Sequence, residues 1–435
     1  MGRPRDVQTR VKHKILRSYL DAWAGIIVNG LAGVAASRAS RGLSFRAGLV
    51  YVDGFSWRGR YDGDASEVLL DGSVLSPKWG SPIVGIQALD DARRFASSRG
   101  VPLETMAVLV EEHADEFQSL LESLKLAGFD TRTVVGPAHL HLVDGQVAAI
   151  LGDFLGHLDQ VEALTQGPYL KAFYLLDPYG PKGIPYDAVA RVVSQPNADV
   201  IINFPFLDVQ RKAGILGRWL AGDVRPRDQA LLANHDALFG TPAWRQIVEQ
   251  VLRDAPPEAQ GELVEEELSR FYMKRLLDAD PALTVKRIAL QFPDRDRTIY
   301  YLYLTTHDAT GALTMNEVLW KAHQEEGELR LLRSQAAWVR RSHRGGQLTL
   351  FDAGLGLASP PPSTQEDRDI DIARLGDHIH AAFRGRAPIL LDVYRHLGNT
   401  DVFPGEVLRA LTRLKRSGRV QYPRLTAHET LRFSS

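Results

Sequence analysis

Two apolar, strand-like runs of this chain end in acidic residues. Residues 49–63 read LVYVDGFSWRGRYDG, a predicted strand that ends in Asp53 and continues into a loop with Gly54 and Gly59. A second apolar run ends in Glu111. In open α/β sheets, ligands lie beyond the carboxyl ends of the strands, where glycines allow close backbone approach and a carboxylate accepts the hydroxyls of a ribose. The pattern predicts a site for a ribose-bearing ligand, with a structural turn and a solvated helix start as alternatives.

A third apolar run is followed immediately by Asp177, Pro178 and Tyr179. A D-P-P-Y or N-P-P-Y segment at a strand end holds an exocyclic amino group in amino-methyltransferases, because the acid or amide and a proline carbonyl accept its hydrogens and the ring stacks on the base. Here Gly180 follows the tyrosine and the second proline comes only at Pro181, so the match is partial. The segment predicts a base-holding site, and a turn built by Asp, Pro and Gly is the alternative.

The elements that must position these residues alternate along the chain. Strand candidates are 48–53, 106–111, 131–136, 172–177 and 199–204, and helix candidates are 10–28, 113–127, 146–158 and 185–193. The strands are too apolar to have a wet face, which is typical of a parallel sheet covered on both sides. Two more strand-like runs, 285–291 and 298–305, are expected at the far edge of this sheet, before a helix at 314–323.

The predicted fold class is α/β, with a Rossmann-like doubly wound sheet over residues 1–325. The acidic, helical stretch at about 207–280 is expected to be an insertion or lid. Glycine and proline are frequent in 326–375, which predicts a linker. A small C-terminal domain over 376–435 has the order helix, helix, basic turn and strand, which predicts a winged helix-turn-helix.

Several of these segments together resemble the three-Cys-motif partner proteins. The resemblance covers roughly residues 10–325, and its strongest parts are LDPYGPKGIP at 176–185 and VIINFPFL at 200–207. Members of this family resemble class I methyltransferases that use S-adenosylmethionine (AdoMet). Their usual genomic partner resembles radical-AdoMet proteins with a three-cysteine iron–sulfur motif, and the family's role is placed in DNA modification or repair.

The resemblance implies AdoMet as cofactor, held by Asp53, Gly54, Phe55, Gly59 and Glu111. It also implies that the target base is held by the segment that follows the third apolar run, which consists of Asp177, Pro178 and Tyr179.

One residue departs from the family pattern. The family's first loop resembles D-x-F-A-G-P-G, and Trp57 stands where a glycine is expected. Three interpretations follow: the loop moves aside, Trp57 and Arg58 form another ligand surface such as a nucleobase platform, or the AdoMet site is lost.

The predicted C-terminal domain is strongly basic. Residues 384–424 hold nine Lys or Arg against three acids, a net +6, which leaves −7 for the rest of a chain whose total is −1. Such a face predicts phosphate contacts and DNA as a partner, with a protein-binding winged helix as the alternative. The candidate nucleic-acid-binding residues are Arg409, Arg413, Lys415, Arg416 and Arg419.

A short peptide in the predicted linker resembles the Q-L-x-L-F motif by which bacterial repair and replication proteins bind the sliding clamp. It consists of Gln347, Leu348, Thr349, Leu350 and Phe351. In an exposed segment, Leu350 and Phe351 would be the apolar anchors and Gln347 would supply directional hydrogen bonds. The alternative is an edge strand packed onto the body of the protein.

Composition limits the remaining chemistry. The 435 residues include no cysteine, which excludes disulfides, thiolate metal sites and a cysteine nucleophile, and agrees with a reducing compartment. His139 and His141 lie near Asp144, but spacing identifies no further ligand, so no metal site is expected. No signal-peptide core and no uninterrupted run of about 20 apolar residues is apparent, which predicts a cytoplasmic protein with no membrane partner.

Two hypotheses follow from the sequence. In the first, the chain is an AdoMet-dependent methyltransferase-like protein that acts on nucleic acid in DNA modification or repair. In the second, it is a non-catalytic DNA-binding subunit that serves a radical-AdoMet iron–sulfur protein, and Trp57 marks a degenerate cofactor site.

Overall fold

The computed structural model divides the chain into two compact units, which are described separately. Of the described residues, those within 16–290 and 298–307 form the first unit, and those within 7–15 and 308–434 together with Gln291 form the second. The structure describes residues 7–61, 67–68, 74–75, 79–137, 140–178, 184–206, 209, 215, 217–218, 225–291, 298–321, 371–398, 400, 402–426 and 428–434.

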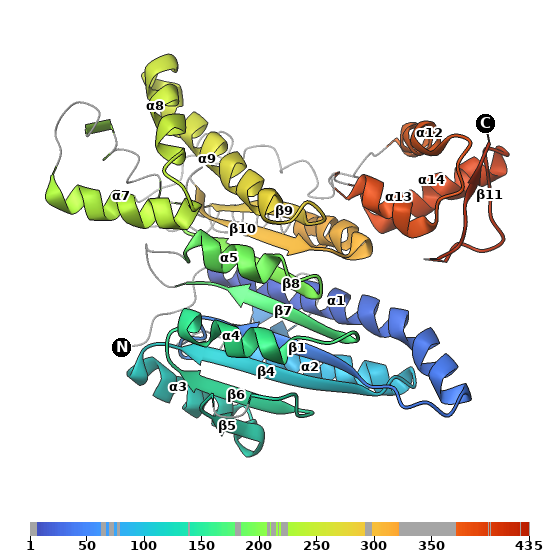
Figure 1. Ribbon diagram of the computed structural model, residues 1–435, viewed down its shortest axis with the longest axis horizontal. Helices are drawn as coiled ribbons and strands as arrows, with labels where there is room; N and C mark the ends of the chain where they lie inside the picture. Colours follow the sequence, from blue (N-terminus) through green and yellow to red (C-terminus); the bar gives the residue numbers. More distant parts are fainter. Residues whose placement is uncertain are drawn as a thin grey trace, which may run out of the picture. The chain divides into compact units, whose positions relative to one another are not determined.

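An eight-stranded sheet forms the centre of the first unit, in the order β5-β6-β4-β1-β7-β8-β10-β9 (Figure 1). The strands are β1 (Ala47–Asp53), β4 (Leu103–Glu111), β5 (Thr133–Val135), β6 (Gln146–Leu151), β7 (Leu170–Leu176), β8 (Ala198–Phe204), β9 (Thr284–Gln291) and β10 (Thr298–Thr306). β1 pairs in parallel with both β4 and β7, and β10 runs antiparallel to β8. From β1, the sheet continues through β4 and β6 on one side and through β7 and β8 on the other. This reversal of strand order creates a topological switch point at the carboxyl ends of β1 and β7.

A mixed α/β fold with a large, mainly parallel sheet is therefore confirmed. All seven residues of β1 and all seven of β8 are buried, as expected for strands covered on both faces. The expected strands at 285–291 and 298–305 are present as β9 and β10 at the far edge. A separate small hairpin pairs β2 (Glu67–Val68) with β3 (Val74–Leu75).

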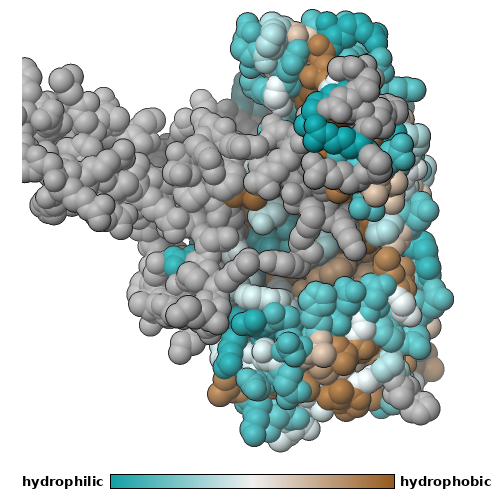
Figure 2. Space-filling view, turned by 90° about the vertical axis from the view of Figure 1, so that its left-hand side faces the viewer, coloured by the Kyte–Doolittle hydropathy of each residue, from teal (hydrophilic) through white to brown (hydrophobic). Residues whose placement is uncertain are grey.

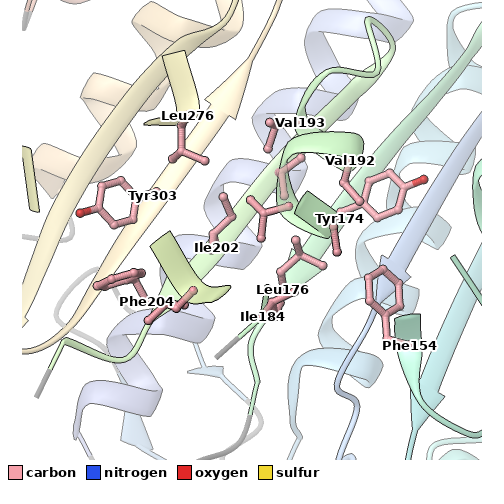
Figure 3. Packing of buried hydrophobic residues seen from close by; sticks show 14 of the residues in the cluster. Phe154, Tyr174, Leu176, Ile184, Val192, Val193, Ile202, Phe204, Leu276 and Tyr303 are labelled. Atoms are coloured by element: carbon pink, nitrogen blue, oxygen red, sulfur yellow. The ribbon is translucent and has the colours of Figure 1, made fainter. Parts of the chain in front are cut away.

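Helices pack on both faces of the sheet. They are α1 (Val7–Ser40), α2 (Ser81–Ser98), α3 (Ala114–Leu126), α4 (Phe154–Leu164), α5 (Tyr186–Val193), α7 (Pro226–Phe239), α8 (Trp244–Asp254) and α9 (Pro257–Ala279). On one face, the rings of Tyr51 and Phe173 stack with their centroids 6.2 Å apart, and the ring centroid of Tyr19 in α1 lies 5.7 Å from that of Phe173. On the other, apolar residues of β7, β8, α4, α5 and α9 form one large core (Figure 3).

A buried carboxylate joins α1 to the sheet. Asp199 of β8 accepts hydrogen bonds from the Tyr19 hydroxyl at 2.6 Å and from the Thr306 hydroxyl at 2.9 Å. Both of its oxygens thereby have partners, which offsets the cost of taking the charge out of water. These hydrogen bonds fix the position of α1 relative to β8 and β10.

The predicted helix at 146–158 is wrong in its first half. Residues 146–151 form β6, and the helix begins only at Phe154. Val147, Ala148, Ala149 and Ile150 are buried on both sides of the sheet, so they form a short continuous apolar run, which periodicity alone does not distinguish from a buried helix segment. α1 also continues to Ser40, beyond the predicted end at residue 28.

One helix among the described residues is long and apolar enough to cross a membrane by length and composition, namely α1 over Thr9–Ser40. Ile15, Tyr19 and Leu20 of α1 are buried in the protein, and 28% of the most apolar stretch of the helix is buried. Asp21, Asn29 and Arg38 interrupt the apolar residues of this helix, so it contains no uninterrupted run of about 20 apolar residues.

The second unit contains three C-terminal helices and a short hairpin. The helices are α12 (Ile372–Phe383), α13 (Leu390–Leu397) and α14 (Pro404–Arg416), and β11 (Val420–Gln421) pairs antiparallel with β12 (Arg432–Phe433). An isolated bridge joins Ile389 to Thr430. The helical residues 309–321 belong to this unit, since the side-chain amide of Asn316 donates to the carbonyl oxygens of Thr400 at 2.8 Å and Val402 at 2.9 Å.

The packing of α2 on β1 predicts an unequal effect of two glycine substitutions. A Cβ at Gly85 would lie 2.1 Å from the Tyr51 ring, whereas a Cβ at Gly25 of α1 would meet nothing within 4 Å. We expect Gly85→Ala to lower the free energy of unfolding by about 1–3 kcal/mol or more through overpacking, and Gly25→Ala to raise it by up to about 1 kcal/mol through helix propensity. Urea denaturation measures both, and equal effects would contradict the packing described.

Candidate active site

A cavity of about 600 Å³ opens at the carboxyl ends of the parallel strands in the first unit. Parallel strands place their carboxyl ends at one edge of a sheet, so the loops after β1, β4, β6 and β7 all contribute to it. Figure 2, which views the molecule from the left-hand side of Figure 1, shows a mixture of hydrophilic and apolar residues on that side. The lining residues are Gly54, Phe55, Trp57, Arg58, Glu111, Glu112, His113, Glu116, Gly152, Asp153, Phe154, Leu155, Pro178, Ile184, Pro185, Asn234, Ala237 and Leu238.

Backbone hydrogen bonds fix the loop that follows β1. The Ser56 N–H donates to the Val110 carbonyl at 2.8 Å, and the Gly80 N–H donates to the Gly59 carbonyl at 2.8 Å. The Ser123 hydroxyl of α3 donates to the Arg58 carbonyl at 2.6 Å. The loop is therefore held by β4, by the start of α2 and by α3.

Glu111 connects this loop to the next one. Its carboxylate accepts the backbone N–H of Trp57 at 2.7 Å through one oxygen and that of His113 at 2.8 Å through the other. The side chain is buried and lines the cavity, which argues against a solvated helix start. A carboxylate has about four acceptor positions, so two remain for a ligand after these two bonds.

Trp57 has the backbone conformation of a glycine. Its φ is +48°, and it is the only residue other than glycine with a positive φ among the residues that the structure describes. This conformation costs an L-residue roughly 1–2 kcal/mol, and the surrounding hydrogen bonds hold it in place. The backbone at position 57 thus has a conformation that favours glycine, as expected for the loop pattern, although the residue is tryptophan.

The indole of Trp57 belongs to a small group of aromatic and charged side chains. Its ring centroid lies 5.1 Å from that of Tyr61, and the Arg58 guanidinium lies 5.4 Å from the indole centroid. Arg58 forms an ion pair with Glu116, in which Nη2 donates to Oε1 at 3.0 Å. The hydrogen bonds that hold the loop argue against a loop that moves aside. The other two interpretations, a different ligand surface such as a nucleobase platform and loss of the AdoMet site, both stay open.

Asp53 lies behind the cavity wall and does not line it. The carboxyl is fully buried, and it accepts hydrogen bonds from the Tyr51 hydroxyl and the Phe55 N–H, both at 3.2 Å. Burial raises the pKa of Asp53 to about 7, and hydrogen bonds from Ser81 and the Phe55 backbone act against that rise. Asp53 therefore stabilises the start of the loop by accepting the Phe55 N–H, and it does not face the cavity.

Of the other predicted cofactor residues, Gly54 and Phe55 line the cavity and Gly59 does not. Gly59 has φ +68°, and a Cβ there would lie 2.9 Å from the Leu120 side chain, so this glycine is required for the turn and for close packing on α3.

The predicted base-holding segment is only partly described. Pro178 lines the cavity, whereas Tyr179 and Gly180 lie outside the described residues. Asp177 accepts a hydrogen bond from the side-chain amide of Asn203 at 2.6 Å, because β7 and β8 are parallel neighbours that end side by side. The amide oxygen of Asn203 is buried without a hydrogen-bond partner. Asn203 belongs to the quoted VIINFPFL segment but was not predicted as a site residue.

Sequence reasoning missed two groups of lining residues. Asp153, Phe154 and Leu155 follow β6, and they were missed because this segment was predicted to be helical. Had the strand been recognised, the rule that ligands lie at strand ends would have indicated Asp153. Asn234, Ala237 and Leu238 come from α7, within the segment predicted as an insertion or lid, and no local motif identifies them.

The cavity wall is acidic. Among the described lining residues, Glu111, Glu112, Glu116 and Asp153 contribute four carboxylates and Arg58 contributes one guanidinium. Since Arg58 is paired with Glu116, the remaining three carboxylates dominate the field inside the cavity. The wall favours a cationic ligand and disfavours a phosphorylated one.

The residue types of this wall fit AdoMet. Carboxylates at two strand ends, Glu111 and Asp153, can accept hydrogen bonds from hydroxyl and amino groups, and Phe154 and Leu155 provide apolar surface for a planar base. The net positive charge of AdoMet suits the acidic wall.

The basic residues of the second unit separate into two kinds. Arg409, Arg413 and Arg416 are exposed at helical spacing on α14. Lys415 donates to the Tyr422 carbonyl at 2.6 Å and lies 4.3 Å from the centre of that ring, and Arg419 is paired with Asp377. Among the described residues, these three arginines make no side-chain hydrogen bond of the kind that engages Lys415 and Arg419, although the charge of Arg413 acts on Asp377.

Two other predicted sites have limited structural information. The clamp-binding peptide, Gln347 to Phe351, and His139 lie outside the described residues. Within the described part of the chain, no group of three or more His, Cys, Asp or Glu side chains is placed to hold a metal ion.

Comparisons with known proteins do not identify a family. No family profile and no curated protein matches the chain. Solved structures with partial likeness include the O-methyltransferase TomG of Streptomyces achromogenes in complex with SAM, with 14% identity, 60% of this chain and 72% of that chain covered, and a TM-score of 0.28. The O-methyltransferase of Bacillus cereus in complex with SAH has 10% identity, 70% and 92% coverage, and a TM-score of 0.25. Protein LPL1258 of Legionella pneumophila has 11% identity, 70% and 86% coverage, and a TM-score of 0.31.

Likenesses with such low TM-scores carry no argument about this chain. The resemblance to the three-Cys-motif partner proteins stays a prediction, and the Rossmann-like arrangement is established by the sheet order of the chain itself.

The buried carboxyl of Asp53 predicts a pH dependence of stability. Its pKa is raised from 3.8 to about 7, so the folded state binds more protons than the unfolded state between those values. As the pH rises from about 4 to about 7, this group should therefore lower the free energy of unfolding by about 1.4 kcal/mol per pH unit. Asp53→Asn should remove that slope and stabilise the protein above the window, as measured by urea denaturation at a series of pH values. An unchanged slope would contradict the assignment.

Proposed function

We propose that this protein is an AdoMet-dependent methyltransferase-like protein that acts on nucleic acid in DNA modification or repair. The observation that carries the proposal is the cavity at the switch point of a Rossmann-like sheet, with Glu111 and Asp153 at two strand ends and Pro178 at a third. The resemblance of residues 176–185 to a base-holding segment supports the same function.

The charge of the cavity favours AdoMet over a dinucleotide. Both ligands contain adenosine and suit a Rossmann-like sheet, but a pyrophosphate needs backbone donors and positive charge around it. Of the lining residues that the structure describes, four carry carboxylates, and the one that carries a guanidinium, Arg58, is paired with Glu116. A cationic sulfonium and ammonium fit this field, whereas two phosphates do not.

In this proposal, the bound AdoMet supplies an electrophilic methyl group, and the residues of the chain position the two reactants. Glu111 accepts hydrogen bonds from the ribose, while the loop of Gly54 and Phe55 lies against the methionine part. Asp177 directly follows β7 and accepts the side-chain amide of Asn203, which lies near the end of β8. Neither side chain lines the cavity; in the proposal they position Pro178, which does, and its carbonyl oxygen can accept a hydrogen of an exocyclic amine. Positioning alone can account for large rate accelerations.

The target would enter beside α7. Pro178, Ile184 and Pro185 form an apolar part of the wall, and Asn234 of α7 adds an amide that can both donate and accept. Such a combination suits a planar base that has left the stack of a nucleic acid.

The second unit is proposed to be a winged helix-turn-helix that binds DNA. Three helices followed by the β11–β12 hairpin, with a bridge from Ile389 to Thr430, support this assignment. α14 would be the helix that lies against DNA, with Arg409, Arg413 and Arg416 as its exposed cations.

The second candidate function is a non-catalytic DNA-binding subunit that serves a radical-AdoMet iron–sulfur protein. The presence of Trp57 at a glycine position favours it, because the indole occupies space beside the cavity that the family leaves open. The absence of cysteine from this chain would leave the iron–sulfur chemistry to the partner.

Calorimetry with AdoMet separates the two candidates. We expect saturable binding to the wild type and at least roughly tenfold weaker binding to Glu111→Gln, because a charge-assisted hydrogen bond contributes about 1.5–3 kcal/mol. Glu104→Gln is the matched control, since Glu104 lies at the other end of β4 and pairs with Arg46. Absence of heat from the wild type at millimolar AdoMet would exclude the methyltransferase proposal and favour the non-catalytic subunit.

The proposed DNA contact predicts a salt-dependent affinity. Replacing Arg409, Arg413 and Arg416 by alanine should weaken duplex binding and reduce the slope of log K against log salt by about 2–3, since each phosphate contact contributes about 0.9. Arg253→Ala, a substitution of an exposed arginine on α8, should change neither value. Fluorescence anisotropy over a range of salt concentrations provides the measurement, and a slope equal to that of the wild type would rule out these contacts.

A further inference from the structure

We infer that Trp57 is a specificity-determining residue that makes the cavity prefer AdoMet, which carries a sulfonium, over S-adenosylhomocysteine (SAH), its uncharged thioether product. The inference rests on the proposed function and deepens it. It assigns a role to the residue at which this chain departs from the family pattern.

The first argument is that the chain keeps a large ring where a glycine would be more stable. The backbone of Trp57 is held at φ +48° by the hydrogen bond from its N–H to Glu111 and by the neighbouring contacts of the loop. Glycine adopts this conformation without strain, and strained residues persist mainly at functional sites. The ring is therefore a candidate for a ligand contact.

The second argument is the position of the ring. The indole lines the cavity in the same loop as Gly54, so a ligand in the cavity can reach it. A cation already lies near this ring, because the Arg58 guanidinium is 5.4 Å from its centroid. The pairing of Arg58 with Glu116 neutralises that cation, so the guanidinium does little to repel a second one.

The third argument is the chemical difference between the two ligands. AdoMet and SAH differ by one methyl group and one positive charge. Tryptophan attracts cations through the negative face of its ring more strongly than the other aromatic side chains do, and the carboxylates of Glu111, Glu112 and Asp153 act in the same direction. Loss of the charge on methyl transfer would weaken the attraction, so the product would leave more readily than the cofactor.

The test is the ratio of the dissociation constants of SAH and AdoMet, measured by calorimetry with the full chain. We expect Trp57→Leu to reduce this ratio roughly three- to tenfold, as a desolvated cation–π contact predicts, and Trp57→Phe to reduce it less. Phe95→Leu is the control: Phe95 is an exposed aromatic residue of α2 that is not among the lining residues of the cavity, so the ratio should stay unchanged.

Trp57→Gly distinguishes charge recognition from obstruction. If the ring recognises the sulfonium, this variant lowers the ratio as Trp57→Leu does. If the ring merely narrows the cavity, the variant binds both ligands more tightly by the same factor, and the inference is overturned. Sinefungin, which carries an ammonium group in place of the sulfonium, should bind the wild type more tightly than SAH does, a result that requires no variant to fold.

The possible failures are distinguishable. Binding of both ligands with a ratio that is the same in the wild type, Trp57→Leu and Trp57→Gly overturns the role of Trp57 and leaves the proposed function standing. Absence of binding by AdoMet, SAH and sinefungin overturns both.

Discussion

The carboxylate of Glu111 is the interaction on which the geometry of the cavity depends. It receives the N–H of Trp57 on one oxygen and the N–H of His113 on the other, and so joins the loop after β1 to the start of α3. Two neighbouring strand ends are thereby fixed relative to each other. A buried charge held by two backbone donors is costly to disturb, which explains how the loop maintains Trp57 in a strained conformation.

The acidic character of the cavity follows from the same arrangement. Parallel strands bring the residues after each carboxyl end to one edge, and in this chain those positions carry acids rather than the lysines or arginines of a phosphate site. The acids that lie at or just after these strand ends are Asp53, Glu111, Asp153 and Asp177. Of these four, Glu111 and Asp153 line the cavity. The fold decides where the charges meet, and the charges decide which ligands are compatible.

The near-neutral total charge is the sum of a basic C-terminal region and an acidic remainder of the chain. The chain carries a net charge of −1, yet residues 384–424 alone carry +6. On α14, three arginines are exposed at helical spacing, while Lys415 and Arg419 stabilise the C-terminal hairpin and helices. The first unit thus has an acidic cavity wall among its described residues, and the second unit has a basic helix, so the two units differ in charge.

The sequence by itself determined the α/β class, the strands β1, β4, β7 and β8, and the position of Glu111 and Pro178 at strand ends, because apolar runs that end in polar residues have a local pattern. It did not reveal β6, since a five-residue apolar run has no period that separates strand from helix. Only the tertiary structure decided that Asp53 lies behind the wall, that Asn203 meets Asp177, and that α7 contributes Asn234. Each of these facts depends on strand order and on contacts between distant segments, which spacing along the chain does not encode.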